Sequence, residues 1–342
     1  MECIFPSPNP KPFGGLNLLL CGDFFQLPPV AGVALYERRP GSVDPQLLSG
    51  RIAYQAFDRT LRLTQLMRQQ GEDPIAIQFR EALTNLRVNA LRQEDWRLLC
   101  TRVANVLSLE EVDSFRDALR VYYTNEEVRE YNHRRLMENN APVMKITARH
   151  TGPKASRASS DEADNLEAEI CLCIGARIML SKNLWTEHGL VNGAMGAVKD
   201  IFWKAGQDPT TDMPYGLMVE FDSYSGPVFS PDLGNCVPVF VSTHKFLLGK
   251  AECSRTQFPV RLGYAVTVYK SQGMTLDKIV IRLPSKKDFA LGLSYVAISR
   301  VKKLSGLLFE TGFDYERFCH AMSDKMRDRE TDAAARSKQI VE

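Results

Sequence analysis

The chain has 342 residues, and its 43 Lys and Arg against 41 Asp and Glu give a formal net charge of +2. A hydrophobic content of 44% and a charged content of 25% are ordinary for a globular protein, and they exclude a disordered chain, a collagen and a small disulfide-stabilised domain. Because the net charge is close to zero, any binding of nucleic acid must come from local basic patches. The length predicts about two domains.

Cysteine usage and hydropathy bear on the compartment. The eight cysteines are scattered, with no CxxC pair, which is typical of reduced thiols in an intracellular protein. No run approaches the roughly 20 apolar residues of a membrane span, and Met1–Gly15 has no apolar core of a secretory leader. We therefore expect an intracellular protein with no membrane partner.

The first structured segment is a short apolar run, Leu16–Cys21, without polar alternation. This pattern predicts a strand buried on both faces of a parallel sheet. It is followed by GDFFQLPPV at Gly22–Val30, which would place polar groups at the carboxyl end of that strand, where α/β sheets bind ligands. The alternative is a strand followed by a proline-rich turn, in which Asp23 is only a cap.

The next hundred residues predict helices and a β-α step. Apolar spacing predicts a strand end within 61–70 and helices over Pro74–Leu86 and Glu94–Val106. Leu119–Tyr123 predicts a strand, and Thr124 with Glu127 forms a capping box for a helix that ends at Leu136. The polar composition of Thr151–Asn165 predicts an exposed linker.

Short β-branched runs separated by turn signals follow from Cys171 to Val260, and they predict a small β-barrel. Buried strands are then predicted within Lys278–Leu283 and Gly306–Glu310, with a helix over Ser294–Val301 between them. Residues 323–342 are a polar tail.

Five strings together resemble the petite-integration-frequency (Pif) helicases, which belong to superfamily 1B together with RecD-like enzymes. Helitron transposons carry helicases of the same family. The five strings are GDFFQLPPV (motif III), LTQLMRQ at Leu63–Gln69 (motif IV), LVNGAMG at Leu190–Gly196 (barrel hairpin), YAVTVYKSQGMTLD at Tyr264–Asp277 (motif V) and YVAISRV at Tyr295–Val301 (motif VI). They occur in the family's order between Gly22 and about Glu310.

The resemblance implies an α/β fold, a RecA-like P-loop helicase core with an inserted small β-barrel. Residues 1–58 would be the C-terminal remnant of the first RecA-like domain. Residues 59–165 and 263–322 would form the second RecA-like domain, 166–262 the barrel and 323–342 the tail.

The resemblance also implies residues that face ATP. Arg68 and Arg300 match two arginines that reach the γ-phosphate, and Gln26 matches the residue that couples this phosphate to DNA. The guanidinium fork suits phosphate because it stays charged and binds two oxygens at once. Asp23, Gln272 and Gly273 are expected near the nucleotide. The alternative for each arginine is a surface salt bridge.

Contacts with single-stranded DNA are expected at four motif V residues, Thr267, Tyr269, Lys270 and Ser271. Hydroxyl and ammonium groups bind phosphate, and a ring stacks on any base. The family usually has His at position 269, so a contact specific to His is replaced here by a flat ring. The alternative is a β-branched strand with exposed polar side chains.

The family's ATP and Mg²⁺ are bound mainly by a GxxxxGK[ST] loop and an Asp-Glu pair that precede motif III. The printed sequence has neither: its only Gly-Lys pair is Gly249-Lys250, followed by Ala251. The chain thus resembles the C-terminal portion of such a helicase, and no metal ligand is assigned within it.

The family implies an ATP-dependent 5′-to-3′ DNA helicase and ATP hydrolase that acts in DNA repair, recombination and telomere maintenance on single-stranded DNA and DNA junctions. We expect the nucleus as its compartment, with the mitochondrion as the alternative. A fragment of this kind is expected to be inactive alone. The competing hypothesis is a truncated product related to Helitron helicases that binds single-stranded DNA or a partner without hydrolysing ATP.

Overall fold

The computed structural model describes residues 12–30, 32–38, 44–229, 234–285, 287–319 and 321–340. The chain forms two compact units. Unit 1 comprises Met1–Asp113 and Ser271–Glu342, and unit 2 comprises Ser114–Lys270. Of the predicted features, the absence of an apolar leader at the start of the chain concerns residues 1–11, which lie outside the described residues.

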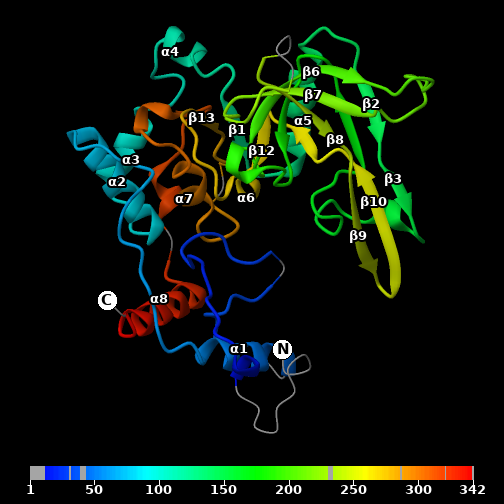
Figure 1. Ribbon diagram of the computed structural model, residues 1–342. Coiled ribbons are helices and arrows are strands. Elements are labelled where there is room, and N and C mark those ends of the chain that lie inside the picture. Colours follow the sequence, from blue (N-terminus) through cyan, green and yellow to red (C-terminus); the bar gives the residue numbers. More distant parts are fainter. Residues whose placement is uncertain are drawn as a thin grey trace. The chain divides into compact units, whose positions relative to one another are not determined.

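Unit 1 is mainly helical and also contains a short parallel strand pair (Figure 1). Its helices are α1 (Pro45–Gln55), α2 (Pro74–Arg87), α3 (Gln93–Cys100), α4 (Leu109–Asp113), α7 (Leu293–Ile298) and α8 (Asp324–Ser337). Strand β13 (Ile279–Ile281) pairs in parallel with β14 (Leu307–Phe309), and both strands are fully buried. Both strands were predicted from their apolar runs. The polar tail folds as α8, which Ser323 caps by accepting a hydrogen bond from the Met326 amide.

Helix α2 follows its prediction closely. Asp73 caps the helix by accepting a hydrogen bond from the Ala76 amide at 3.0 Å, and Pro74 occupies the first helical position. The buried face carries Phe79, Leu83 and Leu86, the spacing that predicted the helix. Helix α3 ends at Cys100, well before the predicted Val106, because the chain turns at residues 101–106.

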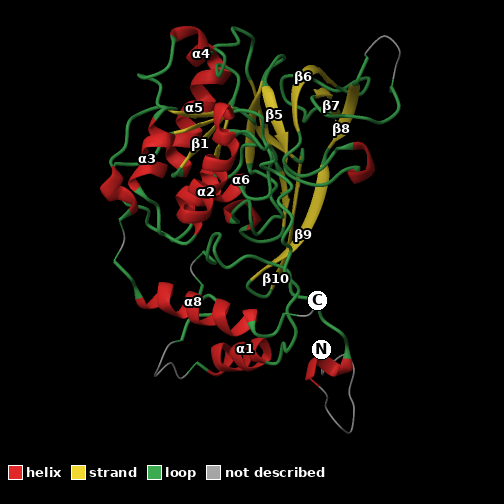
Figure 2. Cartoon of the chain, turned by 90° about the vertical axis from the view of Figure 1, so that its left-hand side faces the viewer, coloured by secondary structure: helices red, strands yellow, loops and turns green. Residues whose placement is uncertain are grey.

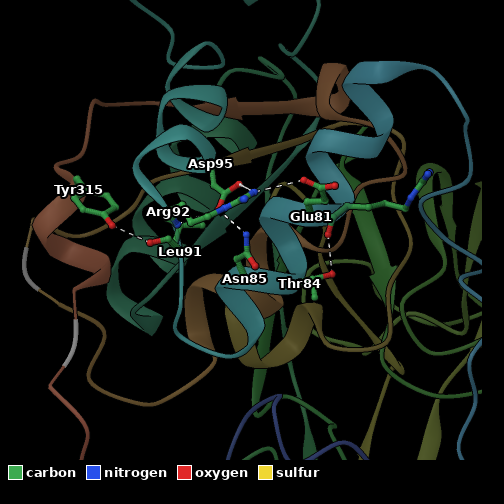
Figure 3. Close-up of polar contacts among 8 residues, drawn as sticks. Glu81, Thr84, Asn85, Leu91, Arg92, Asp95 and Tyr315 are labelled. Carbon is green, nitrogen blue, oxygen red and sulfur yellow. Dashed lines mark hydrogen bonds and ion pairs between the residues drawn. The ribbon is translucent and has the colours of Figure 1, made fainter.

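A polar network fixes α2 against the start of α3 (Figure 3). The carboxylate of Asp95 is 4% exposed and accepts hydrogen bonds from the Asn85 side chain and from the Arg92 amide and guanidinium. Burial alone would raise the pKa of Asp95, but these hydrogen bonds bring it below its ordinary value. The network therefore holds the end of α2, where Arg87 lies, in a fixed position.

The predicted buried strand at Leu16–Cys21 is wrong. Residues 16–21 form no regular structure, and Leu19 is 79% exposed. A doubly buried strand needs hydrogen-bonded neighbours on both sides, and none of the described residues pairs with this segment. The strand end predicted within 61–70 is likewise absent, since only Thr60 forms an isolated bridge, to Ile340.

Unit 2 is rich in antiparallel strands (Figures 1 and 2). Its strands are β1 (Leu119–Tyr122), β2 (Met144–Thr147), β3 (Arg149–Thr151), β4 (Glu169–Leu172), β5 (Arg177–Leu180), β6 (Met195–Phe202), β7 (Gly216–Phe221), β8 (Cys236–Phe240), β9 (Ser242–Leu248), β10 (Ala251–Gln257), β11 (Val260–Leu262) and β12 (Ala265–Thr267). They form a five-stranded sheet in the order β11-β5-β6-β7-β8, a three-stranded sheet β3-β10-β9, the pair β2-β4 and the parallel pair β1-β12. Closure into a small β-barrel stays a prediction, as do the predicted domain boundaries.

The β-α step of unit 2 is confirmed. Strand β1 leads into helix α5 (Asn125–Met137), and Thr124 and Glu127 form the predicted capping box. Asn132 on this helix exchanges two hydrogen bonds with the backbone of Ala265 in β12, at 2.8 and 3.1 Å. The helix therefore fixes the strand that leads into the four-residue helix α6 (Val268–Ser271).

The segment Thr151–Asn165 is mostly exposed, as predicted, but three of its alanines are buried. Its Ala155 and Ala163 are buried, and the fully buried Arg255 donates hydrogen bonds to backbone carbonyls at Ala158 (2.6 Å) and Leu166 (2.9 Å). The polar residues of the segment are largely exposed, while an arginine far along the chain binds backbone carbonyls at its buried positions. Among the described residues, no helix is long and apolar enough to cross a membrane.

Candidate functional site

The loop that carries Asp23 and Gln26 lies in unit 1 and is held by its own side chains. Asp23 accepts hydrogen bonds from the Phe25 amide at 3.0 Å and from the Gln26 side chain at 3.4 Å, and it forms an ion pair with Arg87 at 2.7 Å. The guanidinium carbon of Arg87 also lies 4.3 Å from the centroid of the Phe25 ring. Asp23 is therefore a turn-forming and charge-pairing residue in this structure, and its predicted place near a nucleotide stays a prediction.

Gln26 is linked to the segment that follows α6. The Nε2 of Gln272 donates a hydrogen bond to the Oε1 of Gln26 at 3.0 Å. Gly273 follows with a φ of +86°, which is typical of the glycine that ends a helix, and no atom lies within 4 Å of where its Cβ would be. The structure thus brings together Asp23, Gln26 and Gln272.

Gly292, the residue before α7, allows the backbone of this loop to approach. A Cβ at Gly292 would lie 2.7 Å from the carbonyl oxygen of Gln26 and 2.9 Å from that of Phe25. Its φ of +83° is also strained for any other residue. The motif strings did not include Gly292, although a glycine at the N-cap of a predicted helix is the signal that could have found it.

Arg68 is fixed by two hydrogen bonds. Its Nε donates to the Oγ1 of Thr275 at 2.9 Å, and its Nη1 donates to the carbonyl of Ser299 at 3.1 Å. The neighbouring Gln69 donates from Nε2 to the carbonyls of Ser299 and Val301. The irregular segment that carries Arg68 is therefore anchored to the end of α7 and to the residues that follow it.

Arg300 lies directly after Ser299 and is only 3% exposed. Its Nε donates to the carbonyl of Val296 at 2.7 Å, and its Nη2 donates to the Oγ of Ser299 at 2.8 Å. Burial, followed by the positive charge of Arg68, lowers the pKa of Arg300 to about 10. Burial also lowers the pKa of Arg68.

Neither arginine is neutralised. Among the described residues, neither Arg68 nor Arg300 has a carboxylate within ion-pair distance. Two neighbouring cations without an anion are electrostatically unfavourable, and a bound anion relieves the repulsion. The arrangement can therefore bind and stabilise negative charge, which fits the terminal phosphate of a nucleotide.

Tyr295, on α7, is close enough to Asp23 and to the three arginines of this site for their charges to shift its pKa. Burial raises the pKa of its phenol, and the carboxylate of Asp23 raises it further, while the positive charges of Arg87, Arg300 and Arg68 act in the opposite direction. Sequence reasoning assigned roles to neither Tyr295 nor Arg87. Tyr295 stands inside a motif string, but Arg87 had no signal beyond its place in the last turn of α2.

The residues predicted to contact DNA are divided by burial. Thr267 at the end of β12 is 7% exposed and Ser271 is fully buried, so both side chains are about as enclosed as that of Arg300. Tyr269 and Lys270 on α6 are partly exposed. Lys270 lies 3.9 Å from the carboxylate of Glu167, and burial together with nearby Arg261 lowers its pKa. Exposure of the side chains thus favours Tyr269 and Lys270 over Thr267 and Ser271 as contacts for DNA. The roles of all four residues stay predictions.

No metal site is formed by the described ranges. Within them, no group of three or more His, Cys, Asp or Glu side chains could hold a metal ion. Asp23 is already paired with Arg87. The residues present thus fit phosphate and do not fit a metal ion.

Comparisons with known proteins agree with the motif strings. Residues 1–93 match the family model described as "PIF1-like helicase". The chain is 31% identical over 300 residues to the "ATP-dependent DNA helicase PIF1" of Rattus norvegicus, covering 87% of this chain and 41% of that protein. The chain is a homologue of the Pif1 helicases.

More distant Pif1 proteins match over a similar span. A Pif1 helicase of Psychrobacter is 27% identical over 331 residues, covering 87% of this chain and 48% of that protein. The crystal structure of Pif1 helicase from Candida albicans aligns with a TM-score of 0.69 and 26% identity, covering 95% of this chain and 70% of that chain. The chain therefore has the RecA-like α/β fold of Pif1 helicases, and it spans about two fifths of the length of mammalian relatives that it matches.

A Bacteroides Pif1 shares this fold. Its complex with ADP-AlF3 and single-stranded DNA aligns with a TM-score of 0.62 at 21% identity, covering 98% of this chain and 70% of that chain. That title describes ligands of the Bacteroides protein, and the similarity shows the fold alone.

Proposed function

We propose that Arg68 and Arg300 are arginines of the ATP site of an ATP-dependent 5′-to-3′ DNA helicase. We also propose that α6 is a segment of that helicase that contacts DNA. The observation that supports this most directly is that Arg68 and Arg300 both donate hydrogen bonds to Ser299. Neither arginine is paired with a carboxylate among the described residues. Names of homologues such as the rat protein support ATP-dependent DNA unwinding as the activity.

The chemistry required of the chain is stabilisation of charge. In phosphoryl transfer, negative charge spreads over the oxygens of the transferred group, and preorganised cations lower the energy of that state. Arg68 and Arg300 are held by hydrogen bonds before any phosphate arrives, so they need little reorganisation. The contact between Gln26 and Gln272 connects the loop beside this site to the segment that follows α6.

Binding of single-stranded DNA would rest on Tyr269 and Lys270. A ring and an ammonium group on adjacent residues of α6 can meet a base and a phosphate of one strand. Glu167 and solvent now hold the Lys270 ammonium, so a DNA phosphate would replace a weak ion pair at 3.9 Å.

The printed residues contain no GxxxxGK[ST] string, so we propose that they bind DNA and do not hydrolyse ATP by themselves. A helicase chain that also holds that string would bind Mg²⁺ there and act in repair, recombination or telomere maintenance, including at DNA junctions, in the nucleus or the mitochondrion. A small β-barrel over residues 166–262 is part of this proposal. The second candidate is a DNA- or partner-binding relative of Helitron helicases that never hydrolyses ATP.

The test is ATP turnover by the purified 342-residue protein with and without single-stranded DNA. The control is a triple variant, Gln26→Ala, Arg68→Ala and Arg300→Ala. We expect DNA binding with no turnover above the control. DNA-stimulated turnover above the control would contradict the proposal that these residues do not hydrolyse ATP without a GxxxxGK[ST] loop. An in-frame GxxxxGK[ST] ahead of residue 1 in the transcript would favour the helicase over the Helitron-related candidate, and an immediate stop codon would favour the latter.

A further inference from the structure

Unit 2 contains a cleft that none of the five motif strings includes. Its volume is about 310 Å³, and its walls include Arg149, Lys204, Gln207, Tyr215, Phe240 and Val241. We call this site the aromatic cleft. It lies where β3, the β6–β7 connection and the end of β8 meet, and α6 is separate from β6, β7 and β8 in both Figure 1 and Figure 2.

Two exposed rings form the main wall of the aromatic cleft. Tyr215 is 42% exposed and Phe240 is 44% exposed, and their ring centroids lie 5.3 Å apart. Phe202 packs edge-on against both rings, at 6.0 and 6.4 Å between centroids. Gly216 makes room for this support, since a Cβ there would lie 2.4 Å from the Phe202 ring. The two rings are therefore held at the surface in a fixed arrangement.

The charge of the aromatic cleft is positive. The Nζ of Lys204 lies 4.4 Å from the centroid of the Tyr215 ring, and Arg149 on β3 also lines the cleft. No carboxylate lines the cleft, and among the described residues neither cation has an ion-pair partner. The amide of Lys204 donates to the Oε1 of Gln207 at 2.8 Å, which fixes the turn that presents the lysine.

Fixed exposed rings beside unpaired cations match the chemistry of a nucleotide strand. Bases stack on aromatic rings regardless of sequence, and phosphates bind lysine and arginine. An acidic peptide would also meet the cations, but it would not need the two exposed rings. We propose that the aromatic cleft is a second contact site for single-stranded DNA, with bases on Tyr215 and Phe240 and phosphates on Lys204 and Arg149.

This inference rests on the proposed function, because it adds a contact to the strand that α6 is proposed to bind. Since the aromatic cleft and α6 use different elements, only a strand long enough to reach both should sense the cleft. A short oligonucleotide held at α6 should bind equally well with or without the two rings.

The test is fluorescence anisotropy with labelled single-stranded oligonucleotides of increasing length. We compare the wild-type protein with the double variant Tyr215→Ala and Phe240→Ala. The control is Phe229→Ala, a more exposed aromatic residue (62%) outside the cleft. We expect about a tenfold or greater loss of affinity for long strands in the double variant. The control should be unchanged, and the conservative variant Tyr215→Phe should bind as the wild type does.

Cross-linking gives a second readout that does not depend on folding of a variant. Irradiation of the wild-type protein with an iodouracil-labelled strand should attach the strand to Tyr215 or Phe240. Attachment elsewhere only, with unchanged affinity in the double variant, would overturn the cleft as a DNA site. If Lys270→Ala still weakens binding in that case, the proposed function stands without it. Binding of an acidic peptide that is lost in the double variant, without any effect on DNA, would also overturn the proposal.

Discussion

Gln272 donates a hydrogen bond to Gln26 at 3.0 Å, although the two residues are 246 positions apart in the chain. Gln26 in turn donates to Asp23, whose other carboxylate oxygen is paired with Arg87 at the end of α2. One line of side-chain contacts thus runs from α2 through the loop at 22–30 to the segment after α6.

The arginine pair predicts binding of polyphosphate. Inorganic tripolyphosphate should raise the thermal midpoint of the wild-type protein, because a ligand at ten times its Kd stabilises the folded state by about 1.4 kcal/mol. Arg300→Gln should remove most of this gain, since one of two charges is lost. In a helicase that also holds a phosphate loop, Arg68→Ala should lower kcat by about a thousandfold with DNA binding kept.

The control for this measurement is Arg327→Gln, an exposed arginine on α8 that pairs with Asp324 at 3.1 Å. It should respond to tripolyphosphate as the wild type does. Equal stabilisation of the wild type, Arg300→Gln and Arg327→Gln would show that the anion binds elsewhere.

The Asp95 network predicts a strong stability effect. Asp95→Ala would leave the Asn85 amide without its acceptor and remove the cap of α3. We expect a loss of about 2 kcal/mol in the free energy of unfolding, measured by urea denaturation. Glu81→Ala, which removes only an exposed contact at 3.4 Å with Arg92, should change stability by less than about 0.5 kcal/mol. Equal effects of the two variants would refute the role of the network.

Two buried arginines predict opposite outcomes for the same substitution. Arg329 on α8 is 1% exposed, lies 4.5 Å from the centroid of the Phe25 ring, and has no hydrogen-bond acceptor among the described residues. Arg255 is also buried, but it donates to four backbone carbonyls. Replacing an unpaired buried charge by an apolar side chain is neutral or stabilising.

Arg329→Met should therefore leave the free energy of unfolding unchanged or raise it by about 1 kcal/mol. Arg255→Met should lower it by about 3 kcal/mol, since several carbonyls lose their donor. Chemical denaturation of both variants measures the difference. A loss for Arg329→Met as large as that for Arg255→Met would mean that Arg329 has a partner of comparable strength.

His150 on β3 predicts a dependence of stability on pH. Burial, together with the nearby Arg255, lowers the pKa of His150 below its ordinary value of 6.5, and its Nδ1 is buried without a partner among the described residues. The unfolded chain then takes up a proton at a higher pH than the folded chain does. Stability therefore falls as the pH drops through 6.5 towards the folded pKa.

The thermal midpoint should be lower at pH 5 than at pH 7.5, and His150→Gln should reduce this difference. His133→Gln changes an exposed histidine on α5 and serves as the control. If both variants show the wild-type difference, His150 does not contribute to the pH dependence.

Local signals predicted local structure well. The capping box of Thr124 and Glu127 and the helical spacing in Pro74–Leu86 depend on residues a few positions apart, and both are present. The motif strings pointed to the homologous Pif1 helicases because five of them occur in the same order along the chain. Within the site, they located Gln26, Gln272, Arg68 and Arg300, which the structure brings into one unit.

Features that depend on distant partners were missed. The apolar run at 16–21 lacks the neighbouring strands that its pattern assumes, and nothing within the run reveals this. Four positions within 151–166 are buried where Arg255, about ninety residues later, binds backbone carbonyls, and the polar composition of the segment does not show this. Arg87 pairs with Asp23 across 64 positions, a contact that single-residue signals cannot show.

The most direct test of the account is binding of single-stranded DNA by the 342-residue protein over a range of salt concentrations. We predict measurable binding whose logarithm falls linearly with the logarithm of salt concentration. Lys270→Ala should weaken it and reduce the slope by about one. Lys145→Ala, which removes another lysine of unit 2 paired with a glutamate (Glu169, 2.8 Å), should leave binding unchanged. Absence of binding at low salt, or identical behaviour of the two lysine variants, would contradict the proposal that α6 contacts DNA.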